Sequence, residues 1–577
     1  MKQGDAFIKQ AYGRHLLSTL LALTGSAAGS IVNSVLMGRL LGADLLSVPC
    51  IVIPLHYIFA SAGALIGVGG MAACANLIGE KDPDRCNKAF TVTWLMTLAV
   101  AAVLTAILLP NLDLVVRLLG APPEIYGNVR SYAAVLIISG VFNMGVYPVF
   151  NLLRLDGKMV ASVIVFAVMA VATAVLDLLL IGKFGLGAAG ASIAVYGGLA
   201  AAAIFGAALL IFSGENMKLV RVKAAECWQL AKKILFIGTP SAIENVCILL
   251  KTYALNALIL GGFGVIAVSA FQVVNSVNSF AVIFTAGVSG AIMSFCGVFS
   301  TERDTVSIRQ LLKLAFIEGA VLIAAVTVVC VLIPESISRL FGIDGDALKL
   351  SASAVTIFAV SFLPSMVNNI LICLYQSTGR EWLANVMTVL RGFLFVAGFA
   401  LLLSGVLGIS GIWHSFWLAE LLTLIIALIL GEIIRRKNPY ISRLLLLDTT
   451  IESEGHSIAL SVKDTDEEIA ASAALISEFC EANDISPKRT NAISLAAEEM
   501  LVLIKAHTTV GNTASLRVTT IQGVVVLRIR NFGGVYNPLS EYDDDDMDFL
   551  GLKLVKNMAE IISYQRTFGA NNLTVIL

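Results

Sequence analysis

Charged residues are scarce in this sequence. Asp, Glu, Lys and Arg make up 14% of the 577 residues, whereas a soluble globular chain averages about 25%. Hydrophobic residues make up 58%, and the mean hydropathy is +0.87. This composition excludes an ordinary soluble domain and indicates a membrane protein. The net charge of −1 offers no basic excess, so we expect no nucleic-acid partner.

Paired cysteines are also missing. The nine cysteines stand singly, mostly in apolar stretches, without a Cys-x-x-Cys pair or the Cys/His spacing of a metal site. We therefore expect small buried thiols in a reducing compartment, with no disulfide and no bound metal. Residues 1–14 are polar and basic and a long apolar stretch follows, so we also expect no cleavable signal peptide.

Apolar stretches long enough to cross a bilayer fill the chain as far as residue 434. A transmembrane helix needs about 20 mostly apolar residues, and this length predicts about twelve spans. The predicted spans are 14–38, 45–78, 88–110, 126–153, 158–182, 187–213, 230–260, 264–299, 307–333, 348–377, 382–404 and 409–434. The second and eighth are long enough to tilt, kink or protrude from the bilayer.

Lysine and arginine gather in every second loop between these spans. They are Lys81, Arg85 and Lys88; Arg154 and Lys158; Lys218, Arg221, Lys223, Lys232 and Lys233; Arg303, Arg309 and Lys313; Arg380; and Arg435, Arg436 and Lys437. Because cytoplasmic loops carry the excess of Lys and Arg, we predict that these loops and both termini are cytosolic. The expected location is the inner (cytoplasmic) membrane of a bacterium.

The span region repeats itself. NLIGEKDPDRCNKAF at 76–90 and GVFSTERDTVSIRQL at 297–311 each follow a long apolar span and lie about 221 residues apart. The repeat predicts an all-α membrane region of two six-helix lobes, 1–215 and 216–445. Substrate paths in repeat-built transporters lie between the repeats.

The last part of the chain, 446–577, has a different pattern. Charged residues become frequent, and helical and alternating stretches follow one another. The pattern predicts a cytosolic α/β sandwich of about 125 residues, a normal domain size. Helices are expected at 467–483, 487–507 and 551–562, and strands at 514–519, 524–529 and 572–577, with a turn at Gln522-Gly523.

A carboxylate, Asp177, lies inside the apolar stretch ATAVLDLLLIGKFGLGAAGA at 172–191. A charge near the middle of a bilayer costs a few kcal/mol or more, so such a residue is a candidate for function. Two interpretations are open. Asp177 faces a water-filled cavity and binds a cation, a proton or a cationic substrate, or it lies near the helix end, reaches the interface and caps the turn at 182–190.

Other polar residues in the predicted spans are candidates either for the cavity or for structural contacts between helices. Asn33 is neutral and is typical of interhelical hydrogen bonds. Glu244 and Lys251 are seven residues apart, about 10 Å along one face of a helix. They line the cavity, or Lys251 extends to the interface. Arg391 and Glu420 are expected to pair between helices.

Several motifs of the span region resemble the multidrug and toxin extrusion (MATE) family. They are GRLLGADLLSV at 38–48, GVGGMAACANLIGEKDPDRCNKAF at 67–90, GLGAAGASIA at 185–194, GTPSAIEN at 238–245, STGRE at 377–381 and GIWHSFWLAE at 411–420. The resemblance implies twelve helices in two lobes around a central cavity. It also implies an antiporter that exports organic cations, drugs or metabolites against the entry of Na⁺ or H⁺.

The family's usual cation site is only partly present. The family commonly has an Asp in the first span, where this chain has Asn33, and an Asn where this chain has Thr173. Asp177 remains. The resemblance therefore implies a cation or substrate site that contains Asp177, Thr173 and Asn33 in the first lobe, with Glu244 and Lys251 as candidates in the second.

The C-terminal motifs resemble the GHKL ATP-binding fold of anti-sigma-factor serine kinases and histidine kinases. The motifs are AISLAAEEM at 492–500, RNFGGVYNPL at 530–539, FLGLKLVKNMAEIISYQR at 549–566 and GANNLTVIL at 569–577. The resemblance implies a nucleotide site of Glu499, Asn531, Gly533 and Gly551. Leu503 stands where the family has its magnesium-ligating Asn, and an acidic run at 543–546 opposes a phosphate. We expect a degenerate domain without ATPase or kinase activity.

The expected function is export of a small molecule rather than catalysis. The expected partners are that substrate, the membrane lipids and a cytosolic regulatory protein at the C-terminal domain. Two alternatives are a flippase of a lipid-linked saccharide and a membrane sensor with kinase output. The missing magnesium ligand argues against the sensor.

The loop charges lead to a testable topology. A reporter that is active only outside the cytoplasm, fused after Leu577, should be silent, because the basic loops place the C-terminus in the cytosol. The same reporter inserted in the loop between the first two predicted spans is the positive control. Clear activity of the C-terminal fusion would reverse the orientation.

Overall fold

The computed structural model describes most of the chain. The described residues are 7–10, 12–13, 16–17, 20, 24, 33–39, 42–79, 82–156, 158–213, 217–301, 304–448, 455–507, 513–521, 524–532, 550–567 and 570–577. They form two compact units. One consists of Thr19–Ser289 with Glu318–Ala427, and the other of Met1–Ser18, Gly290–Ile317 and Leu428–Leu577.

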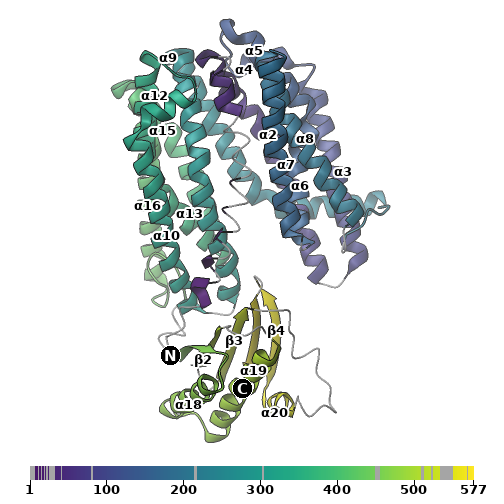
Figure 1. Cartoon of the computed structure of the whole chain (residues 1–577), viewed down its shortest axis with the longest axis vertical. Helices are drawn as coiled ribbons and strands as arrows, with labels where there is room; N and C mark the ends of the chain where they lie inside the picture. The colour runs from purple at the N-terminus through teal and green to yellow at the C-terminus, as the bar shows by residue number, and fades with distance from the viewer. Residues whose placement is uncertain are drawn as a thin grey trace. The chain divides into compact units, whose positions relative to one another are not determined.

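The described elements of the first lobe are all helices (Figure 1). Its elements are α2 (Ala43–Gly79), α3 (Pro83–Leu108), α4 (Leu112–Leu118), the 3₁₀ turn η1 (Pro123–Ile125), α5 (Tyr126–Ile138), α6 (Gly140–Leu155), α7 (Met159–Asp177), the π-helical turn η2 (Leu178–Lys183) and α8 (Gly187–Ser213). Local sequence explains where α3 begins. The Asp82 side chain accepts the Arg85 N–H and Pro83 occupies the first turn, where its missing N–H costs nothing.

The second lobe repeats this plan. Its elements are α9 (Ala224–Thr301), α10 (Thr305–Leu332), α11 (Pro334–Leu340), α12 (Asp346–Ala359), α13 (Phe362–Ser377), α14 (Glu381–Val389), the π-helical turn η3 (Leu390–Leu394), α15 (Phe395–Leu407) and α16 (Ile409–Lys437). The described residues of each lobe thus include a π-helical turn between two helical segments. Such turns are rare and occur often at functional sites.

The helices of the described residues account for most of the predicted spans. Eight are long and apolar enough to cross a membrane, and two more crossings result if each bent helix pair is one span. The apolar part of α9, 50 residues, would extend about 75 Å against about 30 Å of hydrocarbon. Gly264 interrupts it at φ 79°, so α9 contains the predicted seventh and eighth spans. The first predicted span, 14–38, lies mostly outside the described residues, so twelve stays a prediction.

The two lobes approach each other closely at glycines. A side chain at Gly38 would place its Cβ 1.7 Å from the backbone oxygen of Phe341, and one at Gly69 would place it 2.1 Å from that of Ile234. No other residue fits at this distance. Asn256 adds a polar contact, since its Nδ2 donates to the backbone oxygen of Cys50 at 2.7 Å. The lobe interface is therefore a close backbone contact.

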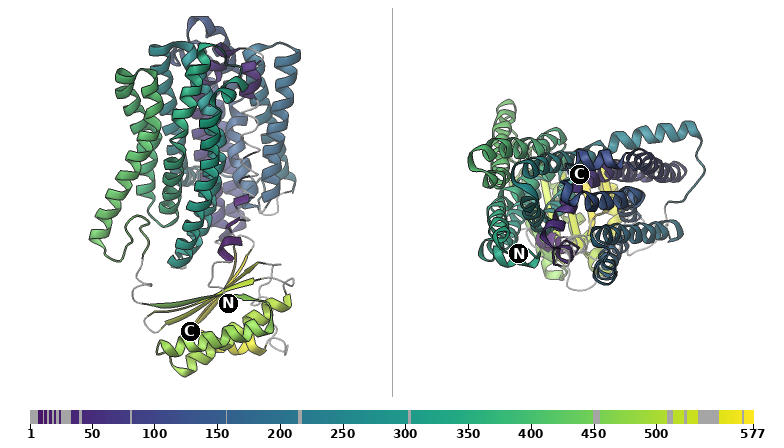
Figure 2. Two further views of the ribbon diagram at one scale, coloured as in Figure 1. Left: turned by 60° about the vertical axis from the view of Figure 1, so that its left-hand side comes forward. Right: turned by 90° about the horizontal axis from the view of Figure 1, so that it is seen from above.

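The C-terminal domain is a five-stranded antiparallel sheet with helices on one face (Figures 1 and 2). The strand order is β1-β2-β3-β5-β4. The elements are β1 (His456–Lys463), α18 (Asp466–Ala482), α19 (Pro487–His507), β2 (Thr513–Ile521), β3 (Val524–Phe532), α20 (Leu550–Met558), β4 (Ile561–Thr567) and β5 (Ala570–Ile576). The predicted fold class is confirmed. The prediction did not include β1 and β4, and the third helix ends at Met558 rather than 562. The predicted turn at 522–523 lies outside the described residues.

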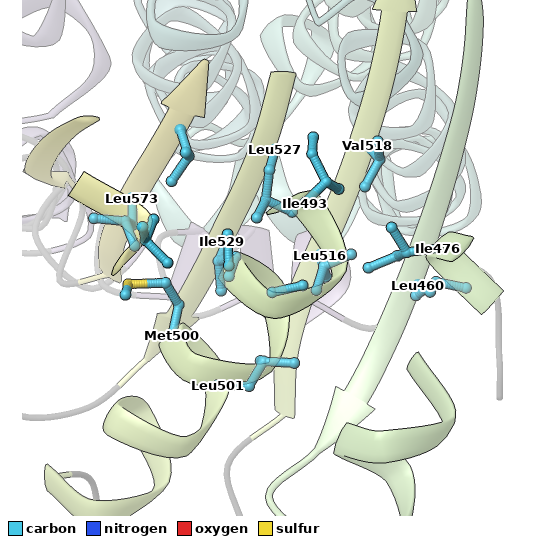
Figure 3. Packing of buried hydrophobic residues seen from close by; sticks show 14 of the residues in the cluster. Leu460, Ile476, Ile493, Met500, Leu501, Leu516, Val518, Leu527, Ile529 and Leu573 are labelled. Atoms are coloured by element: carbon cyan, nitrogen blue, oxygen red, sulfur yellow. The ribbon is translucent and has the colours of Figure 1, made fainter. Parts of the chain in front are cut away.

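The core of this domain lies between the sheet and its helices (Figure 3). Alternate residues of β2 and β3, such as Leu516 and Leu527, point toward Ile493 and Met500 of α19. The residues between them belong to the other face, because successive side chains of a strand alternate. That second face carries Arg517 of β2 and the arginines of β3.

Candidate functional site

The structure brings Asn33 and Asp177 together. Asn33 Nδ2 donates to Asp177 Oδ1 at 2.7 Å and lies 3.4 Å from the backbone oxygen of Ala191 in α8. Both side chains are buried, and Asp177 has no exposed surface. The position is the last residue of α7, directly before the π-helical turn η2. Asp177 thus lies at a helix end, as the second interpretation expects, but its side chain is buried rather than extended to an interface.

The carboxylate of Asp177 lacks a compensating charge. Its partner Asn33 is neutral, and its second oxygen, Oδ2, has no hydrogen-bond partner among the described residues. Thr173 lies one turn earlier and is also buried. Gly198 of α8 leaves room for it, since a Cβ there would be 2.1 Å from Thr173 Oγ1. The three predicted first-lobe residues thus lie together at the π-helical turn.

A second polar group in the first lobe centres on His56, which the sequence analysis did not single out. His56 Nδ1 lies 3.1 Å from Asn143 Nδ2 and 3.4 Å from the Tyr196 hydroxyl. The Tyr196 ring meets the Tyr132 ring edge-on, and Ser192 donates to the backbone oxygen of Tyr132 at 2.9 Å. Ser192 and Tyr196 are four residues apart on one face of α8, a spacing that could have indicated a shared surface.

In the second lobe, Glu420 and Arg391 form the ion pair that the sequence predicted. Arg391 Nη2 lies 2.7 Å from Glu420 Oε1 and Nε lies 3.1 Å from it. The other carboxylate oxygen accepts from Asn368 Nδ2 at 2.7 Å. Arg391 also donates to Asn369 Oδ1 and Ser365 Oγ, both at 2.7 Å. This carboxylate is therefore neutralised from within the protein.

The two lobes differ in charge beside their π-helical turns. Arg391 lies in the π-helical turn η3, as Asp177 adjoins η2. The second lobe pairs its acid with a base, and the first lobe pairs its acid with a neutral amide. A site for a cation or a proton is therefore more plausible at Asp177 than at Glu420. No group of three or more His, Cys, Asp or Glu suited to a metal occurs among the described residues.

Glu244 and Lys251 do not join the Asp177 site. Both lie on α9, where Glu244 is exposed and Lys251 is half-buried. Lys251 lies within electrostatic range of Arg391 and Glu420. Glu244 lies within electrostatic range of Tyr57 and Tyr147 of the first lobe. Lys251 thus lies near the ion pair of the second lobe, and Glu244 lies at the lobe interface.

The implied nucleotide site is only partly described. Asn531 of β3 is fully buried, and its Oδ1 has no hydrogen-bond partner among the described residues. It lines two small cavities of about 10 Å³ each, at the lower limit for one water. Gly551 lies in α20, whereas Gly533 and the acidic run 543–546 lie outside the described residues.

The magnesium side of that site has no oxygen ligand at the expected place. Leu503 is buried in the hydrophobic core of the domain. Glu499, one turn earlier, is half-buried, and burial together with the neighbouring Glu498 raises the pKa of its carboxyl group. A raised pKa reflects surroundings that disfavour the charged carboxylate.

The membrane region matches known sequences. The family model described as MatE matches residues 20–179 and 240–403. The multidrug export protein MepA of Staphylococcus saprophyticus is 21% identical over 409 residues, 70% of this chain and 89% of the relative. MepA of Staphylococcus haemolyticus is 22% identical over 409 residues, with the same coverage of 70% and 89%.

Solved structures match the same region. An inward-facing multidrug resistance MATE family transporter of the MOP superfamily aligns with a TM-score of 0.66 at 19% identity, over 73% of this chain and 98% of that one. The MATE multidrug transporter DinF-BH aligns with a TM-score of 0.64 at 20% identity, over 77% of this chain and 99% of that one. These likenesses show the fold.

The buried ion pair of the second lobe leads to a stability prediction. Glu420→Gln leaves the Arg391 guanidinium buried without a counter-charge, so the free energy of unfolding should fall by about 3–5 kcal/mol. The measurement is the unfolding midpoint of the full-length protein in detergent. Glu335→Gln is the matched control, because both side chains of its pair with Arg339 are 60% exposed and a surface pair contributes at most about 1 kcal/mol. Equal losses in the two variants would contradict a structural role of the Glu420 pair.

Proposed function

Because the chain belongs to the MatE family, whose model matches more than half of it, we propose that it is a secondary active exporter coupled to Na⁺ or H⁺ entry. Members of this family are multi-pass membrane transporters, not enzymes. The proposed substrates are organic cations, drugs or metabolites, and the proposed location is a bacterial cytoplasmic membrane. The relatives named as multidrug exporters support this substrate class.

The observation that carries the proposal is the buried, uncompensated carboxylate of Asp177. Removing a charged carboxylate from water is costly, and a bound Na⁺ or H⁺ lowers that cost by neutralising it. The amide of Asn33 positions one oxygen by a 2.7 Å hydrogen bond and leaves the other open to the ion. A cation at this site would therefore favour the conformation in which Asp177 is buried.

Coupling follows from this difference between conformations. A ligand shifts an equilibrium only by its difference in affinity for the two states. If Asp177 holds the ion in one state and releases it in the other, the ion gradient drives the change of state. Glu420 cannot serve in the same way while Arg391 neutralises it at 2.7 Å.

The coupling role of Asp177 can be tested directly. Asp177→Asn should abolish gradient-driven efflux of ethidium, used as a fluorescent organic cation, from proteoliposomes, because the amide cannot bind or release a charge. Asp113→Asn is the control, since Asp113 pairs with Arg130 on an exposed segment. Both variants should be recovered from the membrane in similar amount. Normal efflux by Asp177→Asn would place the coupling elsewhere, with Glu244 the next candidate.

For the C-terminal domain, we propose a GHKL-like fold without nucleotide chemistry. Phosphoryl transfer depends on magnesium to neutralise charge on the phosphates. The buried Leu503 supplies no oxygen for that ion, and the described space beside Asn531 holds about one water. Both observations favour a regulatory role over kinase output.

The full-length protein should therefore show no magnesium-dependent ATP turnover. Phosphate release from ATP is measured in detergent with magnesium and with EDTA, and both rates should equal the rate without protein. Calorimetry on the same sample should show at most weak binding that magnesium does not strengthen. Magnesium-dependent turnover, or micromolar binding that requires magnesium, would return the sensor-kinase alternative to first place.

A further inference from the structure

The helix-free face of the C-terminal sheet carries buried arginines. Arg517 of β2 and Arg530 of β3 have only 8% and 6% of their surface exposed. Neither belongs to the core between the sheet and α18–α20, whose residues alternate with them along the strands. Arginine is almost never buried to this extent unless it is paired. Something other than the domain's own helices must therefore cover this face.

The covering residues come from the junction between α9 and α10. Asp304, whose side chain has no exposed surface, accepts from Arg517 Nη1 and from Arg530 Nη1, the latter at 3.1 Å. Arg517 Nη1 also lies 3.1 Å from Ser307 Oγ. The guanidinium of Arg530 lies over the ring of Phe299, 4.6 Å from its centre. These contacts combine charge-assisted hydrogen bonds with a cation–π interaction.

The N-terminal segment contributes an aromatic contact to the same face. Phe7 stacks on Phe532 of β3 with ring centres 4.8 Å apart and planes inclined by 22°. Both rings are buried. We call Arg517, Arg530 and Phe532 the docking face. Its partners, Phe299, Asp304, Ser307 and Phe7, all belong to the same compact unit of the structure as the docking face itself.

The first lobe provides an internal comparison. Asp82 and Asp304 are equivalent in the repeat, about 222 residues apart, and each begins a helix. Asp82 Oδ1 accepts the Arg85 N–H at 3.0 Å, as Asp304 Oδ1 accepts the Ser307 N–H at 3.0 Å. The Asp82 side chain is 37% exposed, whereas that of Asp304 is fully buried. Helix capping therefore explains why an aspartate stands at both positions. It does not explain the two arginines that contact Asp304.

We propose that the docking face is an intramolecular docking surface for the α9–α10 junction, and that this contact restrains the second lobe and slows the transport cycle. α9 and α10 contain consecutive spans, and alternating access requires one repeat to move against the other. A contact made in only one conformation holds the protein in that conformation. The restraint rests on the proposed exporter function, whereas the docking does not.

Limited proteolysis of the full-length protein in detergent tests the docking. The sequence places Arg303 directly before Asp304, and trypsin cuts between them. Asp304→Asn keeps the helix cap, because Asn caps as well as Asp, but removes the charge that holds the arginines. Arg517→Gln removes one arginine and leaves the cleaved sequence unchanged. Both variants should be cut at this bond at least tenfold faster than the unaltered protein.

Asp82→Asn is the matched control for the loss of a cap charge, and its cleavage after Arg303 should equal that of the unaltered protein. The docking would be wrong if Arg517→Gln were also cut at the unaltered rate. It would be wrong as well if Asp82→Asn accelerated the cut as much as Asp304→Asn, because the effect would then be one of general helix stability.

Efflux of ethidium from proteoliposomes tests the restraint. Asp304→Asn and Arg517→Gln should raise the initial rate at least twofold, and Asp82→Asn should leave it unchanged. Faster cleavage with an unchanged or lower efflux rate would overturn the restraint and keep the docking. Absence of efflux by the unaltered protein would overturn the exporter function and the restraint with it, whereas the proteolysis result would still decide the docking.

Discussion

The cost of placing a charge in an apolar medium governs the membrane part of this protein. Each buried ionic side chain there needs a neutralising partner. Glu420 has one, because Arg391 lies 2.7 Å away and three neutral side chains complete the hydrogen bonds of the pair. Asp177 has only the amide of Asn33 among the described residues. Among the described residues, the first lobe therefore pairs its buried carboxylate with a neutral amide, and the second lobe pairs its own with an arginine.

The same constraint accounts for the contact at the C-terminal sheet. Two arginines are buried on a face without helices, and they are compatible with burial because Asp304 lies between them. The ring face of Phe299 adds a cation–π contact with Arg530. The aspartate that starts a helix in both lobes has thus acquired a second role in only one of them.

Local sequence signals predicted the helices and strands well, but they predicted less well which residues contact one another. Apolar length indicated the spans, and period-two alternation indicated β2 and β3. β1 and β4 were missed: β4 begins at Ile561, three residues after α20 ends at Met558, so the start of the strand continued the helical pattern. The pairing of Arg391 with Glu420 was predictable, because apolar stretches offer few other groups that neutralise a charge. His56 was not among the sequence candidates, since its partners lie on other helices.

The sequence by itself determined the membrane class, the repeat and the carboxylate at 177, because these depend on composition and on local sequence pattern. Only the tertiary structure decided which residues meet. Asn33 reaches Asp177 across 144 positions, and Arg517 reaches Asp304 across 213. Contacts at such separation depend on how helices and sheets pack, and no local periodicity specifies that packing.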